Sequence, residues 1–351
     1  MRVGSLVLVY TVGRDRSKCF LRKQKKMMWY AEPTREGWFT GMVKVRRSLI
    51  LAIAVATIVV AELRAVGCPA VRAVVDGAVG GMFRELSSTE LAQHEELFRA
   101  FLLDEADLEV RALALGYRIL RTVPGVLALV EHEDHRTGRG VFLSRPTALS
   151  NLVVQAPHRF FDRDTDVIAR LLFEEGGYRA AAWNTVPRWS AGGGIRGAAD
   201  TQATTSSAFV AFARALHRAE PMTTIVQIHG FSPDKRSTPE GRRAGVIVSQ
   251  GTTAPAPWFR LLTAALTIRF PGAVACFPRR VEELGALSNT TAATLRELGS
   301  DRFVHLELSP RWRDRLIHDH RQRARVSSAL HIYADPRYGD PDRAKMAGRS
   351  R

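Results

Sequence analysis

The stretch that decides the fold is "NLVVQAPHRFFDRDTDVIARLLFEEGG", residues 151–177. It opens with an apolar run typical of a strand that is buried on both faces, and it turns at Pro157 and His158. From Thr165 the apolar residues follow helical spacing until the chain reaches a glycine pair, which predicts an amphipathic helix. A buried strand followed by such a helix is the repeating unit of an α/β fold.

The same alternation continues downstream. Apolar strand-like runs occupy 178–189 (its first half), 222–231, 244–251 and 302–309, and helical patterns occupy 206–219 and 256–270. We therefore predict an α/β fold with a mostly parallel or mixed sheet and helices on both faces.

The rest of the chain divides around a predicted catalytic α/β core at 151–316. We expect residues 62–150 to form a smaller α+β segment packed on the core, with a helix at 87–120 and a β-hairpin at 125–144. The Gly/Ala/Thr-rich stretch 190–206 is typical of a loop and would suit a lid. Residues 317–351 are Arg-rich, and we expect a basic tail there, with a surface helix and disorder.

The N-terminal 61 residues are typical of a leader. "VKVRR" precedes an uninterrupted apolar run at 48–61, which is too short to span a bilayer but matches a signal-peptide core. We expect translation to start at Met42 and the protein to be exported, with membrane association through this segment. Cys68 loosely fits a lipoprotein site, and a buried helix is the alternative for the apolar run.

The net charge of +16 does not indicate a nucleic-acid-binding protein. The excess lies at the two ends of the chain, whereas residues 62–310 carry 28 Lys/Arg and 27 Asp/Glu. A nucleic-acid enzyme places its basic residues on a folded face, so we expect no nucleic-acid partner. Three cysteines give no disulfide framework.

Two histidines follow predicted parallel strands. His158 comes after "NLVVQAP" and His229 ends "TTIVQI", just before a glycine. Ligands bind at the carboxyl ends of parallel strands, so these side chains are expected to converge. With Asp162, four residues after the first histidine, they would make a zinc site with an open position for water. Asp164 is the other candidate for the carboxylate.

A third element is "RFVHLELS", residues 302–309. Period-two alternation places Phe303, His305 and Glu307 on one face of this strand. A carboxylate in so apolar a strand costs free energy unless it is paired or functional, which makes Glu307 the candidate general base. The alternative is an edge strand on which Glu307 faces solvent and pairs with Arg311 or Arg313.

These three motifs, in this order, resemble those of the zinc-carboxypeptidase-like amidohydrolases, over about 151–316. The relatives with the most similar motifs are the poly-γ-glutamate hydrolases and the N-formylglutamate amidohydrolases. The resemblance implies that His158 and His229 bind zinc and that Glu307 is catalytic. The chain departs from the family at the carboxylate ligand, because the spacing from His158 to Asp162 is four residues rather than three or five.

Two further residues lie in "WNTVPRW", residues 183–189, which follows another predicted strand. Arg188 would hold a substrate carboxylate, as an arginine does in related enzymes, because guanidinium pairs with carboxylate bidentately. Asn184 is the second candidate for substrate binding. Asn289 is expected to cap a helix.

The sequence thus predicts an exported zinc-dependent hydrolase of amide bonds. Its substrate would be a small peptide, a γ-glutamyl compound or an N-acyl amino acid. The alternative is a non-catalytic exported binding or envelope protein that keeps the fold.

Overall fold

The computed structural model describes residues 69–148, 150–190 and 199–335. The predicted leader at 1–61, the start at Met42 and the lipoprotein cysteine Cys68 lie outside these residues, as do 336–351. Export and membrane association therefore stay predictions. No described helix is long and apolar enough to cross a membrane.

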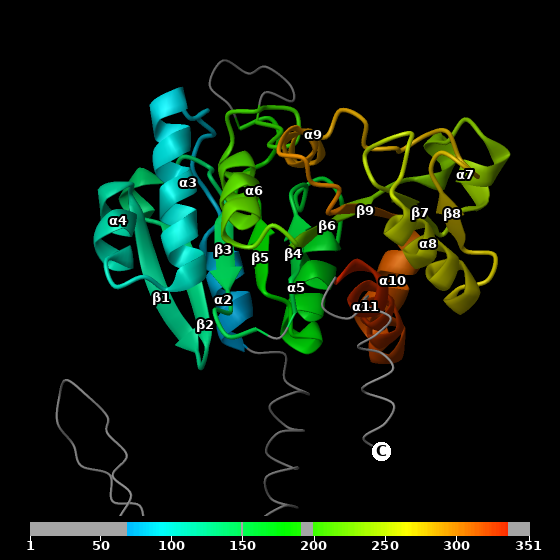
Figure 1. Ribbon diagram of the computed structural model, residues 1–351, viewed down its shortest axis with the longest axis horizontal. Helices are drawn as coiled ribbons and strands as arrows, with labels where there is room; N and C mark the ends of the chain where they lie inside the picture. Colours follow the sequence, from blue (N-terminus) through cyan, green and yellow to red (C-terminus); the bar gives the residue numbers. More distant parts are fainter. Residues whose placement is uncertain (1–68, 149, 191–198, 336–351) are drawn as a thin grey trace, which may run out of the picture. The chain divides into compact units, whose positions relative to one another are not determined.

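One mixed sheet of nine strands, in the order β1-β2-β3-β5-β4-β6-β9-β7-β8, forms the centre of the described part of the chain (Figure 1). The strands are β1 (Tyr117–Val123), β2 (Val126–Glu131), β3 (Val141–Ser144), β4 (Leu152–Ala156), β5 (Ala180–Trp183), β6 (Thr224–Gly230), β7 (Val246–Ser249), β8 (Val274–Cys276) and β9 (Phe303–Leu308). The β5-β4-β6-β9 block is parallel, β7 runs antiparallel to β9, and β1-β2-β3 form an antiparallel extension. The predicted mixed α/β sheet is confirmed.

Helices cover both faces of this sheet, as predicted. On one face lie α3 (Ser88–Leu103), α4 (Leu108–Ala114), α6 (Ala208–Ala219) and α9 (Thr290–Glu297). On the other lie α2 (Pro69–Gly77), α5 (Thr165–Gly176), α8 (Pro257–Arg269), α10 (Pro310–His318) and α11 (His320–Ala334). The short α7 (Pro239–Arg243) follows β6. Each face of the sheet therefore has its own hydrophobic core.

The hairpin predicted at 125–144 continues the sheet of the core. β3 pairs with β5, so β1 and β2 become the edge of the same nine-stranded sheet. The helix predicted at 87–120 is wrong over its last four residues. Gly116 has a left-handed φ of 76°, which ends the helical stretch, and Tyr117 pairs with Glu131 to start β1.

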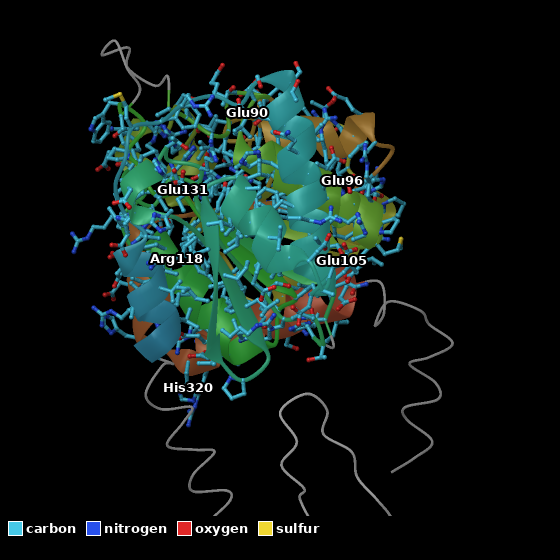
Figure 2. All side chains as sticks on the ribbon, turned by 90° about the vertical axis from the view of Figure 1, so that its left-hand side faces the viewer. Glu90, Glu96, Glu105, Arg118, Glu131 and His320 are labelled. Carbon is cyan, nitrogen blue, oxygen red and sulfur yellow. The ribbon has the colours of Figure 1, made fainter. Side chains whose placement is uncertain are left out.

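The outer surface of this segment is covered by paired charges (Figure 2). Glu90 completes a capping box with Ser87 at the start of α3 and also binds Arg84. Arg99 contacts both Glu96 at 3.1 Å and Glu105 at 2.6 Å. Five arginines of this segment pair with carboxylates: Arg84, Arg99, Arg111, Arg118 and Arg121.

The expected basic tail begins, instead, with a packed helix. In α11, Val326, Ala329 and Leu330 are buried in the same core as β4 and α5. Arg323 is also buried, where it pairs with Glu175 at 2.5 Å. The arginines that suggested a solvated tail occupy one side of an amphipathic helix, and the small and apolar residues between them face the core.

We expect Leu330→Ala to destabilise the protein. Leu330 is fully buried, and such a truncation costs about 2–5 kcal/mol of the free energy of unfolding. Urea unfolding monitored by circular dichroism measures this, with the exposed Arg321→Ala in the same helix as the control. Equal unfolding midpoints for the two variants would contradict the packing of α11.

Candidate active site

The candidate site lies at the carboxyl ends of three adjacent parallel strands. β4 and β9 flank β6, and the register places His229 of β6 directly beside Glu307 of β9. His158 comes two residues after β4 ends, on the turn into α5. All three side chains are buried.

Asp162 lies between the two histidines. Its Oδ2 is 3.5 Å from Nδ1 of His158 and 3.3 Å from Nδ1 of His229. These three residues offer ligand atoms within 4.8 Å of one another and could hold a metal ion. Asp164, the other candidate carboxylate, is the N-terminal cap residue of α5 and pairs with Arg163 instead.

The opposite ring nitrogen of each histidine has its own partner. Nε2 of His158 lies 2.8 Å from Oδ1 of Asp200, and Nε2 of His229 lies 3.3 Å from Oε1 of Gln227. Each of these oxygens can accept a ring proton at Nε2. With a metal bound, the proton of each ring would lie on Nε2, and Nδ1 would then be the ligand atom.

Sequence reasoning missed Asp200. It lies in the predicted loop at 190–206, of which residues 191–198 are outside the described part. The sequence could have indicated it, because Asp200 is the sole acidic residue between 190 and 206.

A network of hydrogen-bonded buried side-chain amides contacts His229 through Gln227. Nε2 of Gln227 donates to Gln155 and to Gln202, both at 2.9 Å. Asn289 donates to Oε1 of Gln227 at 2.8 Å and, as predicted, its own oxygen caps a helix by accepting from Ala292 N. The amide orientation of Gln227 is thereby fixed, with its Oε1 toward Nε2 of His229.

Glu307 is buried in a central strand rather than exposed at an edge, so the alternative of a solvated ion pair does not hold. Its Oε1 lies 3.6 Å from Nε2 of His305, and its Oε2 has no hydrogen-bond partner among the described residues. Burial, followed by the negative charge of Asp162, raises the pKa of Glu307 to about 8. A buried carboxyl with an orphaned oxygen marks a place where another group is expected to bind.

His305 was not predicted as a site residue, although strand alternation put it on the same face as Glu307. It lies against His229, with ring centroids 4.4 Å apart. His229, His305 and Glu307 form a second set that could hold a metal ion. The two sets share His229.

The carboxylates of Asp162 and Asp200 favour a positive charge at His158, and the pKa values of the site show this. Burial lowers the pKa of His158, but hydrogen bonds to Asp162 and Asp200 more than offset this and raise it above its ordinary value. Burial likewise opposes ionisation of Asp162, yet its hydrogen bonds to His158 and His229 hold the pKa of that carboxyl well below its usual range. Burial lowers the pKa of His229 to about 4, so its ring is neutral.

Arg188, the predicted substrate-binding residue, lies beside His158 and Asp200. Its guanidinium contacts Nδ1 of His158, lies 3.4 Å from Asp200 Oδ2, and packs over Phe161 with 4.7 Å to the ring centroid. Asn184 is buried after β5, where its side-chain oxygen accepts from Val186 N at 3.3 Å. That hydrogen bond shapes the turn, and a substrate-binding role of Asn184 stays a prediction.

The space around residue 230 explains why a glycine follows His229. A Cβ there would lie 2.6 Å from the Arg313 guanidinium and 3.3 Å from Cβ of Asp162. Arg313 is buried and donates to Leu308 O at 2.6 Å. A side chain at residue 230 would therefore displace Asp162 or Arg313.

The comparisons with known proteins are weak. Neither family profiles nor curated proteins match this chain. Among solved structures it is similar to the gene product Atu2144 from Agrobacterium tumefaciens, at 12% identity and a TM-score of 0.33, covering 58% of this chain and 93% of that one. It is also similar to an N-formylglutamate amidohydrolase from Ralstonia eutropha JMP134, at 12% identity and a TM-score of 0.32, covering 56% and 95%.

Proposed function

We propose that this protein is a zinc-dependent hydrolase of amide bonds. The observation that supports this most directly is the convergence of His158 Nδ1, His229 Nδ1 and the Asp162 carboxylate beside the buried Glu307. Two histidines and one carboxylate with an open position are the donor set of hydrolytic zinc sites. The orphaned Oε2 of Glu307 is consistent with a further group in the site.

The donor set fits zinc in both kind and protonation. Zinc ligation needs a deprotonated carboxylate and unprotonated ring nitrogens. Asp162 is ionised, and with zinc bound Asp200 and Gln227 would accept the ring protons at Nε2. When bound, zinc would lower the pKa of a water molecule to about 7 and polarise the scissile carbonyl.

Glu307 is the proposed proton carrier. As a carboxylate it would take the proton of the attacking water and deliver it to the leaving nitrogen of the amide. Burial and the neighbouring Asp162 raise its pKa to about 8, so without a metal Glu307 is mostly protonated at pH 7. The positive charge of bound zinc would lower this pKa and favour the carboxylate that acts as the base.

Arg188 is the proposed binding group for a substrate carboxylate. Its side chain is 26% exposed and lies beside the exposed Phe161, so it borders both solvent and the ligand atoms. A small peptide, a γ-glutamyl compound or an N-acyl amino acid carries the carboxylate that such a guanidinium would bind.

One observation favours a second candidate, a non-catalytic binding protein. The Arg188 guanidinium contacts Nδ1 of His158, one of the proposed ligand atoms. If the Arg188 guanidinium stayed at this position, it would provide the positive charge that Asp162 and Asp200 attract. It would then exclude zinc from the site.

Arg188→Gln separates the two candidates. For the hydrolase we expect zinc content to be unchanged and kcat/KM to fall roughly 10- to 100-fold on carboxylate-bearing substrates, since a charge-assisted hydrogen bond contributes about 1.5–3 kcal/mol. The exposed Arg163→Gln is the matched control. A wild type without zinc and a variant that binds it would support the non-catalytic protein.

Asp200→Ala tests whether Asp200 orients His158. We expect the Kd for zinc to rise about 10- to 100-fold, because carboxylates that fix a ligating histidine have effects of this size. Titration against a fluorescent zinc chelator measures it, with Asp234→Ala as a control outside the site. An unchanged Kd would remove Asp200 from this role.

A further inference from the structure

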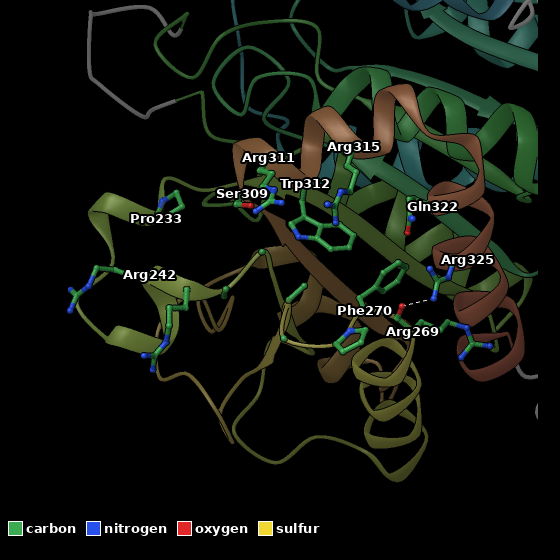
Figure 3. A pocket seen from close by; sticks show the side chains of 16 residues that line it. Pro233, Arg242, Arg269, Phe270, Ser309, Arg311, Trp312, Arg315, Gln322 and Arg325 are labelled. Atoms are coloured by element: carbon green, nitrogen blue, oxygen red, sulfur yellow. Dashed lines mark hydrogen bonds between the residues drawn. The ribbon is translucent and has the colours of Figure 1, made fainter.

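A cavity in the described part of the chain is lined by none of the candidate active-site residues (Figure 3). It encloses about 570 Å³, within the usual range for small-molecule sites of about 300–1,000 Å³. The turn after α7, the end of α8, the first turns of α10 and one side of α11 form its walls.

Six arginines and no acidic residue line this cavity. They are Arg242, Arg243, Arg269, Arg311, Arg315 and Arg325. Within the described residues, Arg243 pairs with Glu240 at 3.0 Å, whereas the structure gives no ion pair for the other five. This differs from the α3 side of the molecule, where arginines have carboxylate partners.

Aromatic side chains of the walls position two of these guanidinium groups, whereas Arg242 and Arg269 donate to backbone oxygens of their own segments. Arg315 packs over Trp312 and Arg325 over Phe270, with 5.3 and 5.2 Å to the ring centroids. Arg325 also donates to Arg269 O at 2.6 Å, which links α11 to the end of α8 (Figure 3). Like charges gathered in one concave site, with no acid to balance them, favour a bound anion.

We propose that this pocket binds a small organic anion that carries two or more phosphate groups. Guanidinium recognises phosphate bidentately, and several unpaired arginines can neutralise more charge than one phosphate offers. The volume exceeds the needs of a single phosphate ion. The aromatic rings are buried beneath the arginines and are therefore not available to stack on a base.

The pocket shares no lining residue with either candidate metal set. Phe270 and Trp312 pack in the same core as Leu306 and Leu308 of β9. Strand alternation turns Glu307 toward the opposite face, with Phe303. The anion proposal and the zinc proposal are therefore tested with different ligands and with different residues.

A ligand series that differs only in phosphate number tests the proposal. Isothermal titration calorimetry on the full chain would compare fructose 1,6-bisphosphate, fructose 6-phosphate and fructose at fixed salt. We expect the bisphosphate to bind at one site, the monophosphate to bind more weakly by a factor of about ten or more, and the sugar not to bind. The physical reason is that removing one charge-assisted hydrogen bond weakens binding by about tenfold or more.

The variants locate the binding. Arg311→Gln/Arg315→Gln should weaken the bisphosphate at least about tenfold, and Arg279→Gln/Arg280→Gln, which removes the same charge from exposed positions outside the pocket, should not. Arg311→Gln alone serves if the double variant does not fold. No binding by the wild type, or equal weakening in both double variants, would overturn the proposal. Tighter binding of random single-stranded DNA, lost with Arg311 and Arg315, would overturn it in favour of a nucleic-acid site.

Discussion

Glu307→Gln is expected to abolish amide hydrolysis while leaving the zinc in place. Glutamine keeps the size of the side chain but cannot accept and return the proton of the attacking water. General acid–base groups contribute about 10²–10⁴-fold, so we expect kcat to fall by that amount with little change in KM. Turnover of a γ-glutamyl dipeptide, an N-acyl amino acid and an α-dipeptide by the zinc-loaded protein measures the effect.

The matched control is Glu297→Gln, an exposed glutamate on α9. Zinc content of both variants, measured by plasma mass spectrometry, should equal that of the wild type. If Glu307→Gln retained full activity, Glu307 would not be the base. If it lost both zinc and activity, Glu307 would be a ligand, as in the set with His229 and His305.

His229→Ala is expected to lose the zinc itself. His229 belongs to both candidate metal sets, so the variant loses a zinc ligand whichever set binds the metal. Zinc should fall from about one per chain to near zero, and activity on all three substrates should fall with it. The exposed His135→Ala is the control.

Circular dichroism and the unfolding midpoint of His229→Ala distinguish metal loss from misfolding. A folded variant that still binds one zinc per chain would contradict both metal sets. A folded wild type without zinc after growth in zinc-supplemented medium would favour the non-catalytic protein.

The sequence predicted the central strands well because their signal is local. The runs around Leu152–Ala156, Thr224–Gly230 and Phe303–Leu308 are apolar throughout, as strands buried on both faces require. The same strand ends carry His158 and His229, and alternation alone placed Glu307 on one face with His305.

The features that the sequence did not predict depend on contacts between residues that are distant in the chain. Tyr117–Leu120 continues an apolar helical pattern, and only its pairing with β2 makes it a strand. The sequence of the arginine-rich α11 predicted a solvent-exposed helix, because its buried face is defined only by packing on α5 and α8. Asp200 acquires its role from a histidine 42 residues away in the chain. The arginine pocket likewise gathers residues between 233 and 325, none of which forms a motif in the sequence.

The most direct test of the zinc hydrolase is a crystal structure of zinc-loaded protein with anomalous diffraction at the zinc edge. We predict one anomalous peak, about 2.0–2.2 Å from Nδ1 of His158, Nδ1 of His229 and a carboxylate oxygen of Asp162, with Arg188 turned away from His158. A peak held by His305 and Glu307, or no peak with Arg188 still on His158, would contradict the account.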